Sequence, residues 1–399
     1  MDNFFKLPAV ANVLSKSKNT LWLGSNPNSG YENLKLYSSN LYRAPAEKHG
    51  KYSVVVSSQS LDTLSYAFDA YLDEAVRLLK KTGHLILNFK ETDAVNLINV
   101  KSLLGRSILS HFKVIEQQKS TDGSIYLLLS VTRINFASYK DKSWSFIVLT
   151  NGTRPTQLQN FINSVQEINP KAEILVVGGD KEPKGTTLVN YDSSKLADIA
   201  AKKNFAVTKA TNSNILITHD RYTLSPDFFN SFEYFGYDFE YLTIPQRFKD
   251  SNEVFPSLAA LPNAQYQWQN SVYLGDGHYE AGTYVNGGLF IAKKHLLLAH
   301  PLNPLNFWNE AEDVEFSWTL RAKGVVARVN LGTIAYTTDK SPADIRNYRP
   351  GVVGNPALVG VKKVIFDTSS ELIAKIPPQT KEKLRMHPIV KALRARIQN

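Results

Sequence analysis

The feature that most constrains the fold is a short apolar run, Ile215–Thr218, which ends directly at His219 and Asp220. A continuous apolar run of this length is typical of a parallel strand that is buried on both faces. A helical segment carrying Lys203 and Asn204 precedes the run, and a polar turn follows it. Open α/β sheets bind ligands at the carboxyl ends of their strands. The pattern therefore predicts a ligand-binding role for Asp220.

Composition limits the classes of protein that this chain can belong to. With 399 residues, of which 43% are hydrophobic and 21% charged, the chain has the size and balance of a globular protein of two or three domains. It contains no cysteine, which excludes disulfides, thiolate metal ligands and a cysteine nucleophile. No apolar run approaches the roughly 20 residues that span a bilayer, and the first residues do not resemble a secretory signal. We therefore expect a cytoplasmic protein.

The formal net charge of +10 is concentrated at the end of the chain. From Lys375 to Asn399 there are seven basic residues, and Glu382 is the only acidic one. We therefore predict a C-terminal extension, residues 339–399, with a basic amphipathic tail and a body that does not bind nucleic acid. Such a tail can lie on an anionic membrane, placing the protein at its inner face, or dock as a solvated helix on the body. The sequence leaves both open.

Residues 1–138 alternate between strand-like and helix-like patterns, which predicts an α/β sheet domain. The amphipathic helix is expected at 65–81 and is expected to end at Gly83. The last two strands are expected to form a pair around the turn Asp122-Gly123. The predicted strands are 20–24, 34–39, 52–57, 84–89, 112–116 and 124–131.

The segment YSVVVSSQSLDTL…AVRLLKKTGHLIL, beginning at Tyr52, resembles class I S-adenosylmethionine-dependent methyltransferases, which have a Rossmann-like fold. That family expects closely spaced glycines after the first strand, but only Gly24 and Gly30 are present here, with Pro27 between them. The strand 34–39 also lacks the terminal acid that would hold a ribose. The resemblance therefore implies a degenerate, methyltransferase-like accessory domain that does not bind S-adenosylmethionine.

A polar segment at 138–143 separates this region from a second one, 144–338. The second region opens with a strand at 144–149, a loop, and a helix that begins at Pro155. A second strand, 173–177, then runs into Gly178-Gly179-Asp180. This order of strand, helix and strand predicts one nucleotide-binding half of a doubly wound sheet.

The second region resembles family 2 glycosyltransferases with the GT-A fold, and the resemblance covers about half of the chain. It implies that a nucleotide-sugar donor is held at its base and ribose by the loop after the first strand, at its uracil by an aspartate, and near its diphosphate by a basic residue and an asparagine. The corresponding residues here are Thr150, Asn151, Arg154, Asp180, Lys203 and Asn204.

Asp220 matches the last acidic position of that family's metal motif, which implies a Mn²⁺ or Mg²⁺ ion on the donor diphosphate. Thr218 and His219 stand where the other acidic residues are expected, so a weaker metal requirement, or none, stays open. Simpler interpretations also stay open: Asp180 as a turn residue, Lys203 as a surface lysine and His219 as a structural histidine.

Two further motifs match the acceptor side of the same family. Gly287-Gly288 resembles the glycine pair beneath the donor sugar, where the backbone can approach a substrate closely. Glu312 and Asp313 open a predicted helix that ends at Gly324, and the resemblance implies that both are catalytic, with Asp313 as the general base. These acids can alternatively be favourable charges on the helix dipole.

The resemblance therefore implies a transferase that moves a sugar, expected to come from a UDP-sugar, onto a hydroxyl of a glycan or other acceptor with inversion. The aromatic segment 234–278, with Tyr266 and Trp268, is a candidate acceptor lid. Two rivals remain: a bifunctional methyltransferase–glycosyltransferase, and a non-enzymatic glycan-binding or scaffold protein built on the same folds.

Overall fold

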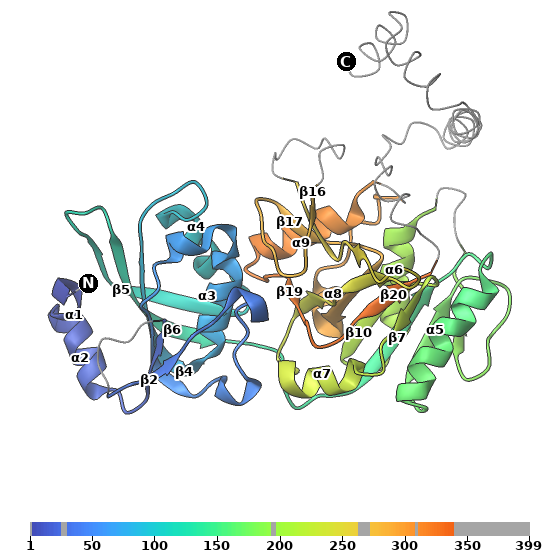
Figure 1. The fold of residues 1–399 in the computed structure, drawn as a ribbon, viewed down its shortest axis with the longest axis horizontal. Helices are drawn as coiled ribbons and strands as arrows, with labels where there is room; N and C mark the ends of the chain where they lie inside the picture. Colours follow the sequence, from blue (N-terminus) through green and yellow to red (C-terminus); the bar gives the residue numbers. More distant parts are fainter. Residues whose placement is uncertain (1, 25–29, 193–196, 262–271, 308–309, 339–399) are drawn as a thin grey trace, which may run out of the picture. The chain divides into compact units, whose positions relative to one another are not determined.

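The computed structural model describes residues 2–24, 30–192, 197–261, 272–307 and 310–338, which all belong to one compact unit, residues 1–350 (Figure 1). The predicted C-terminal extension lies outside the described residues, as do Tyr266 and Trp268 of the predicted lid. Among the helices that are described, none is both long enough and apolar enough to cross a bilayer.

The first region is built on a six-stranded sheet with the order β2-β1-β3-β4-β6-β5. Strands β2, β1, β3 and β4 are parallel, whereas β6 is antiparallel to both of its neighbours. The predicted terminal strand pair is confirmed as β5 and β6. The strands are β1 (Thr20–Leu23), β2 (Glu32–Leu34), β3 (Tyr52–Ser57), β4 (Leu79–Phe89), β5 (Ser110–Lys119) and β6 (Ile125–Ile134).

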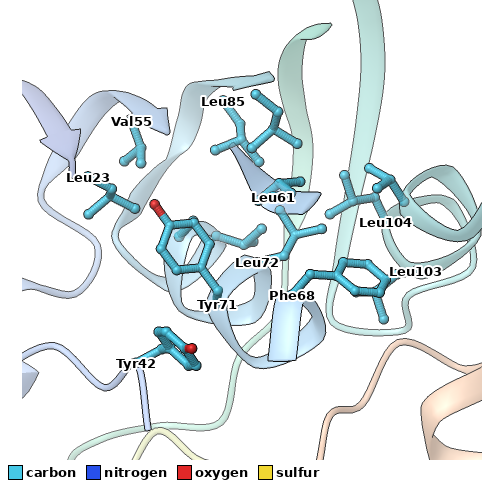
Figure 2. Packing of buried hydrophobic residues seen from close by; sticks show 14 of the residues in the cluster. Leu23, Tyr42, Val55, Leu61, Phe68, Tyr71, Leu72, Leu85, Leu103 and Leu104 are labelled. Carbon is cyan, nitrogen blue, oxygen red and sulfur yellow. The ribbon is translucent and has the colours of Figure 1, made fainter. Parts of the chain in front are cut away.

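Helices cover both faces of this sheet. Residues of α1 (Asp2–Phe5) and α2 (Pro8–Lys16) pack on one face against Trp22, Val54 and Ile86. Residues of α3 (Phe68–Arg77) and α4 (Leu97–Gly105) pack on the other face. Figure 2 shows this second core, in which strand residues meet aromatic and aliphatic side chains of the two helices. The labelled strand residues are Leu23, Val55 and Leu85, and the helix residues are Phe68, Tyr71, Leu72, Leu103 and Leu104.

Two predictions in this region were wrong. The helix expected at 65–81 is a 3₁₀ segment, η3 (Leu61–Ala67), followed by α3, which ends at Arg77. Gly83 lies inside β4 and does not end a helix. A Cβ atom at Gly83 would come within 2.9 Å of a Leu79 methyl carbon, so the glycine permits a close approach within the strand. In place of the strand expected at 34–39, the structure has β2 at Glu32–Leu34 and a 3₁₀ turn at Ser38–Asn40.

The second region is built on a seven-stranded sheet with the order β19-β12-β18-β10-β7-β8-β9. Strands β9, β8, β7 and β10 are parallel, and β18 runs antiparallel to β10. The predicted strands 144–149 and 173–177 and the buried strand through Ile215–Thr218 are confirmed. The strands are β7 (Trp144–Leu149), β8 (Glu173–Val177), β9 (Thr187–Val189), β10 (Asn214–His219), β12 (Tyr241–Thr243), β18 (Leu289–Lys293) and β19 (Arg328–Val329).

Side chains alternate along β7 between two cores, as a strand buried on both faces requires. Phe146 and Val148 face residues of α5 (Pro155–Ile168) and α7 (Phe228–Phe235), whereas Ile147 and Leu149 belong to the core of the opposite face. That opposite core includes α6 (Ile199–Lys209), α8 (Lys294–Ala299) and α9 (Glu312–Ala322). Pro155 is the first residue of α5, as predicted.

Two smaller sheets complete the described part of the second region. The first has the order β11-β20-β13-β14, and the second has the order β16-β15-β17. Short stretches of the aromatic segment 234–278 form strands of these sheets and the end of α7. Their bounds are β11 (Tyr222–Leu224), β13 (Gln246–Phe248), β14 (Val254–Phe255), β15 (Leu258–Ala260), β16 (Val272–Leu274), β17 (Thr283–Val285) and β20 (Ala335–Thr337).

Buried ion pairs connect the two regions. Arg328 beside β12 donates to Asp73 of α3 at 2.7 Å and to Glu74 at 3.1 Å. From the first region, Arg43 donates to Asp238 at 2.6 Å. All five side chains are buried. Removing one partner from such a network leaves an uncompensated buried charge, so these contacts couple the two regions although the chain between them is polar.

Candidate functional site

The donor side of the candidate site lies where β7 and β10 end next to each other. Asp220 directly follows β10 and is only 2% exposed. Its backbone N–H donates to the carbonyl of Leu149, the last residue of β7, at 3.1 Å. Thr150 donates its hydroxyl to Asp220 Oδ2 at 2.7 Å, and Arg154 Nη1 lies 3.3 Å from Asp220 Oδ1. The structure thus brings three predicted donor-site residues together.

The loop after β8 lies against the same edge. Gly178 and Gly179 both have positive φ angles, 88° and 84°. A Cβ atom at Gly178 would come within 2.5 Å of the Thr150 carbonyl oxygen, so only glycine fits there. Asp180 follows in the loop after β8 and is exposed, and its contact with a donor stays a prediction.

Lys202, which the sequence analysis did not select, also belongs to this cluster. It donates to the Thr150 carbonyl at 2.7 Å, and burial lowers its pKa while Asp198 and Asp220 oppose that shift. Adjacent residues on a helix point about 100° apart, so Lys202 faces the strand ends while Lys203 faces elsewhere. The sequence signal for Lys202 is its place next to Lys203 on a predicted helix, because two adjacent helical lysines must point to different faces.

Lys203 and Asn204 differ from the expected donor contacts. Lys203 is fully buried, so the surface-lysine alternative is wrong, and it donates to the Gly287 carbonyl at 3.0 Å and to Glu312 Oε1 at 2.9 Å. Asn204 donates to the Leu302 carbonyl at 2.7 Å and accepts from the Leu302 N–H at 3.0 Å. Its amide thus anchors the segment after α8, and a direct donor contact stays a prediction without structural support.

The glycine pair is required by the protein itself. A Cβ atom at Gly287 would come within 2.8 Å of Asp313 Cβ. At Gly288 it would come within 2.8 Å of Arg221 Nη2 and 2.9 Å of the Tyr222 hydroxyl. Both positions therefore let neighbouring side chains approach the backbone, whereas the predicted reason was close approach of a substrate.

Asp313 lies in the first turn of α9, against this glycine pair. Its Oδ2 accepts from the Gly287 N–H at 2.8 Å, and its Oδ1 accepts from the Val314 N–H at 2.9 Å. Burial, together with the neighbouring Glu312 carboxylate, raises the pKa of Asp313 to about 7, while the Gly287 N–H and Lys203 oppose the shift. A carboxyl with such a pKa is suited to accept a proton near neutral pH.

The two halves of the site meet through the antiparallel pairing of β10 and β18. Thr218 at the end of β10 is paired with Leu289 at the start of β18. The His219 N–H donates to the Gly288 carbonyl at 3.1 Å. A continuous path of contacts therefore runs from Asp313 through the glycine pair to His219 and Asp220. The predicted donor and acceptor motifs line one edge of the sheet.

The described residues do not form a metal site at this edge. No group of three histidine, aspartate or glutamate side chains in the described part of the chain is arranged to hold a cation. Asp220 supplies one carboxylate, and that carboxylate is already compensated by Arg154 and hydrogen-bonded by Thr150. A hard cation prefers six or more oxygen ligands. The Asp220 carboxylate could become one of them only after Arg154 had moved away from it. The metal role of Asp220 thus stays a prediction.

Comparisons with known proteins gave no family model and no curated protein that matches the chain. Solved structures similar to it include TarS 1–349 of S. aureus, with 14% identity over 50% of this chain and 59% of that one, at a TM-score of 0.31. GalNAc-T7 with UDP, GalNAc and Mn²⁺ has 12% sequence identity over 51% of this chain and 45% of that one, at a TM-score of 0.40. Mannosyltransferase PcManGT from Pyrobaculum calidifontis, with GDP-Man and Mn²⁺, has 16% sequence identity over 50% of this chain and 57% of that one, at a TM-score of 0.35.

The chain covers less than two thirds of each of these three structures. Their scores are too low to carry conclusions about this chain, so its function has to be inferred from its own residues.

Proposed function

We propose that this protein is a glycosyltransferase with a GT-A domain, which moves a sugar from a nucleotide-diphosphate donor, expected to be a UDP-sugar, to a hydroxyl of a glycan or other acceptor. One observation carries the proposal. Asp313 accepts from the Gly287 N–H, and the carbonyl of the next residue, Gly288, accepts from the His219 N–H. His219 is followed directly by Asp220, which pairs with Arg154. A proton acceptor and an anion-binding group thus lie at the carboxyl ends of the parallel strands β7 and β10, where α/β proteins bind ligands.

In the proposed reaction, Asp313 accepts the proton of the acceptor hydroxyl as that oxygen attacks the anomeric carbon of the donor. The new bond joins the acceptor oxygen to the anomeric carbon, and the bond from that carbon to the diphosphate oxygen breaks. The nucleoside diphosphate leaves with the bonding electron pair. A single displacement of this kind inverts the configuration at the anomeric carbon.

In this proposal, basic side chains of the protein stabilise the negative charge that develops on the leaving diphosphate. Arg154 is partly exposed above Asp220, and Lys202 lies at the adjacent Thr150 carbonyl. Cations placed where negative charge develops lower the barrier without reorganisation of solvent. A Mn²⁺ or Mg²⁺ ion stays a prediction from the family resemblance, because the described residues do not provide its ligands. No step is assigned to it.

Lys203 and Glu312 are given a supporting role. Their buried ion pair joins α6 to the start of α9, and Lys203 also holds the Gly287 carbonyl. Glu312 in turn lies beside Asp313, and its charge helps to raise the pKa of that carboxyl. The pair therefore positions the proposed base and tunes its proton affinity, and Glu312 need not touch a substrate to matter for activity.

The first region is proposed to be an accessory domain without methyl transfer. A Cβ atom at Gly24 would come within 2.8 Å of Ser58 Oγ, and the Ser58 N–H and hydroxyl both donate to the Leu23 carbonyl at 2.9 Å. The strand end that would face a cofactor is thus packed by the neighbouring loop. This supports a domain without bound S-adenosylmethionine over the bifunctional alternative. Cytoplasmic localisation and membrane contact through the basic tail stay predictions.

A donor screen tests the proposal. The full chain is mixed with UDP-, GDP- and dTDP-sugars, with Mn²⁺ or with EDTA, and its thermal unfolding is followed, because a ligand that binds only the folded state raises Tm. We expect one nucleotide class to raise Tm and its sugar to be released or transferred with time. Binding without turnover on any acceptor would favour the non-enzymatic glycan-binding alternative, and no shift with any donor would contradict the proposal.

A further inference from the structure

We propose that a cavity of about 230 Å³ walled by both regions binds a sugar ring of the acceptor, distant from the ring that is glycosylated. The identification of the ligand as part of the acceptor rests on the proposed function, whereas the cavity does not. Its walls come from η3, α3 and α4 of the first region and from α9 and the segment before β17 of the second. The lining residues used below are Tyr66, Asp69, Tyr279, Thr283, Ser317 and Arg321.

The size of the cavity fits a six-membered ring with polar substituents. An apolar cavity of about 150 Å³ accommodates benzene, so a volume of about 230 Å³ has room for a larger ring that carries hydroxyl groups. Two tyrosines, Tyr66 and Tyr279, contribute aromatic rings to the lining, and the remaining lining residues are a mixture of polar and small apolar ones. A mixture of aromatic faces with hydrogen-bonding groups suits a sugar better than a purely apolar or purely charged ligand.

Asp69 gives the cavity a specific chemical requirement. It is 5% exposed, its Oδ2 accepts from Arg321 Nε at 2.6 Å, and its Oδ1 is buried with no hydrogen-bond partner among the described residues. A buried carboxylate oxygen without a donor is unfavourable, and a bound hydroxyl that reaches it after a shift of the Arg321 side chain would supply that donor. Arg321 is half exposed at 51%, so it can adjust to a ligand while keeping the Asp69 pair.

Two elements connect the cavity to the proposed base. On α9, Asp313 lies four residues before Ser317 and eight before Arg321, which corresponds to rises of about 6 Å and about 12 Å at roughly 1.5 Å per residue. Around β17, Thr283 and Gly287 are four residues apart, which corresponds to about 13 Å in an extended chain. A single sugar ring bound at the Arg321 and Thr283 end of the cavity does not reach Asp313. The proposed acceptor is therefore an oligosaccharide or a glycoside with several sugar units, and it runs along α9.

This assignment also gives the first region a role. Tyr66 and Asp69 belong to it, and the buried Arg328–Asp73 and Arg328–Glu74 pairs hold α3 against the second region. A degenerate methyltransferase-like domain would then serve as one wall of the acceptor site. Selectivity for the acceptor would then depend on the first region, whereas selectivity for the donor would not.

The test uses the full chain and three variants. Asp69→Asn removes the carboxylate charge at constant shape, Tyr66→Ala removes an aromatic wall, and Tyr37→Ala is the control, since Tyr37 belongs to the same region, is 57% exposed and does not line the cavity. Ligand-observed NMR titrations with glucose, galactose and N-acetylglucosamine, and with their β-1,4-linked di- and trisaccharides, measure saccharide binding. Donor binding is measured separately by thermal shift with the nucleotide sugars.

We expect di- or trisaccharides to bind the wild type and the Tyr37→Ala control equally, and to bind the Asp69→Asn and Tyr66→Ala variants at least about tenfold more weakly. The donor-induced Tm shift should be the same in all four proteins, and KM for a saccharide acceptor should rise while kcat changes little. Saccharide binding that depends on Asp69 in a protein that binds no donor would support the cavity and reject the transferase. No saccharide binding, or binding that neither variant weakens, would overturn the inference.

Discussion

The two regions share an architecture but differ at the carboxyl edges of their sheets. In the first region the end of β1 is held by Ser58, which donates to the Leu23 carbonyl from both its N–H and its hydroxyl. In the second region the corresponding edge holds Thr150, Arg154, Lys202 and Asp220, whose charges and hydroxyls are arranged around the end of β10. The first region thus uses the end of β1 for contacts within the protein, whereas the second region gathers charged and hydroxyl side chains at the ends of β7 and β10. Function follows from the site and not from the fold.

The largest effect is expected for Asp313→Asn, which removes the proposed base at nearly constant shape. Turnover should fall by at least roughly 10²-fold, within the usual range for general bases, while the donor-induced Tm shift stays near that of the wild type. Steady-state kinetics and thermal shift measure the two quantities. The matched control is Glu315→Gln in the same helix turn, because Glu315 accepts from Asn303 and Asn306 and a glutamine can keep part of these bonds.

A turnover of Asp313→Asn within a few fold of wild type would make Asp313 a helix-terminal charge only. Glu312 would then be tested next as the base, since it lies one residue away.

Lys203→Met should have the largest effect on stability. The substitution leaves Glu312 without its buried partner and leaves the Gly287 carbonyl without a donor. Breaking a buried pair in this way costs about 3–5 kcal/mol. Denaturant unfolding should show this loss, whereas the neighbouring Lys202→Met should lose much less, because Lys202 is not fully buried and donates only to the Thr150 carbonyl in the contacts described here. Equal losses in both variants would contradict a specific role of the Lys203–Glu312 pair.

Asp220→Asn separates the two roles that have been assigned to Asp220. An asparagine can still accept from Thr150 but no longer forms the ion pair that positions Arg154 for the diphosphate, so we expect donor affinity to fall about tenfold both with Mn²⁺ and with EDTA. Donor titrations in the two buffers make the measurement. A loss that occurs only in the presence of Mn²⁺ would instead establish Asp220 as a metal ligand and would restore the role implied by the family resemblance.

The pH dependence of turnover should reflect Asp313. Its pKa is raised to about 7, and only the ionised carboxylate can accept a proton, so turnover should fall about tenfold for each pH unit below that value. The same shift has the opposite sign for stability. Because the folded pKa exceeds the unfolded one, the favourable contribution is complete in acid and is lost as pH rises through about 7. Rate profiles and Tm between pH 5 and 9 check both signs, with Asp313→Asn as the flat control.

Local patterns predicted the elements well where burial was continuous. Strand β10 and the start of α5 at Pro155 followed from the apolar run and from proline geometry. The pattern was misleading at Leu78 and Leu79, because two buried leucines extend a helical face and also begin a strand, and only the pairing of Leu79 with Tyr52 decides between them.

The candidate site was predictable in its positions but not in its contacts. Lys203 and Asn204 are adjacent in the sequence, yet one is buried against Glu312 and the other bonds to Leu302. Such partners come from segments about a hundred residues away, so no local pattern contains them. Lys202 was missed because only Lys203 and Asn204 matched the family motif, although the helical spacing of Lys202 and Lys203 places them on different faces of α6.

The smallest expected effect is none at all: the full chain should show no saturable binding of S-adenosylmethionine by calorimetry. The comparison of the two sheet edges gives the reason. A ligand at the end of β1 would need the backbone around Gly24, but Ser58 and Gln59 already occupy the space within 3.1 Å of the position of a Cβ atom there. β2 also ends at Leu34, so it offers no acidic residue at its carboxyl end for a ribose. Thermal shift with a nucleotide sugar on the same sample serves as the positive control. Micromolar binding of S-adenosylmethionine would show that this edge can open, and it would revive the bifunctional alternative.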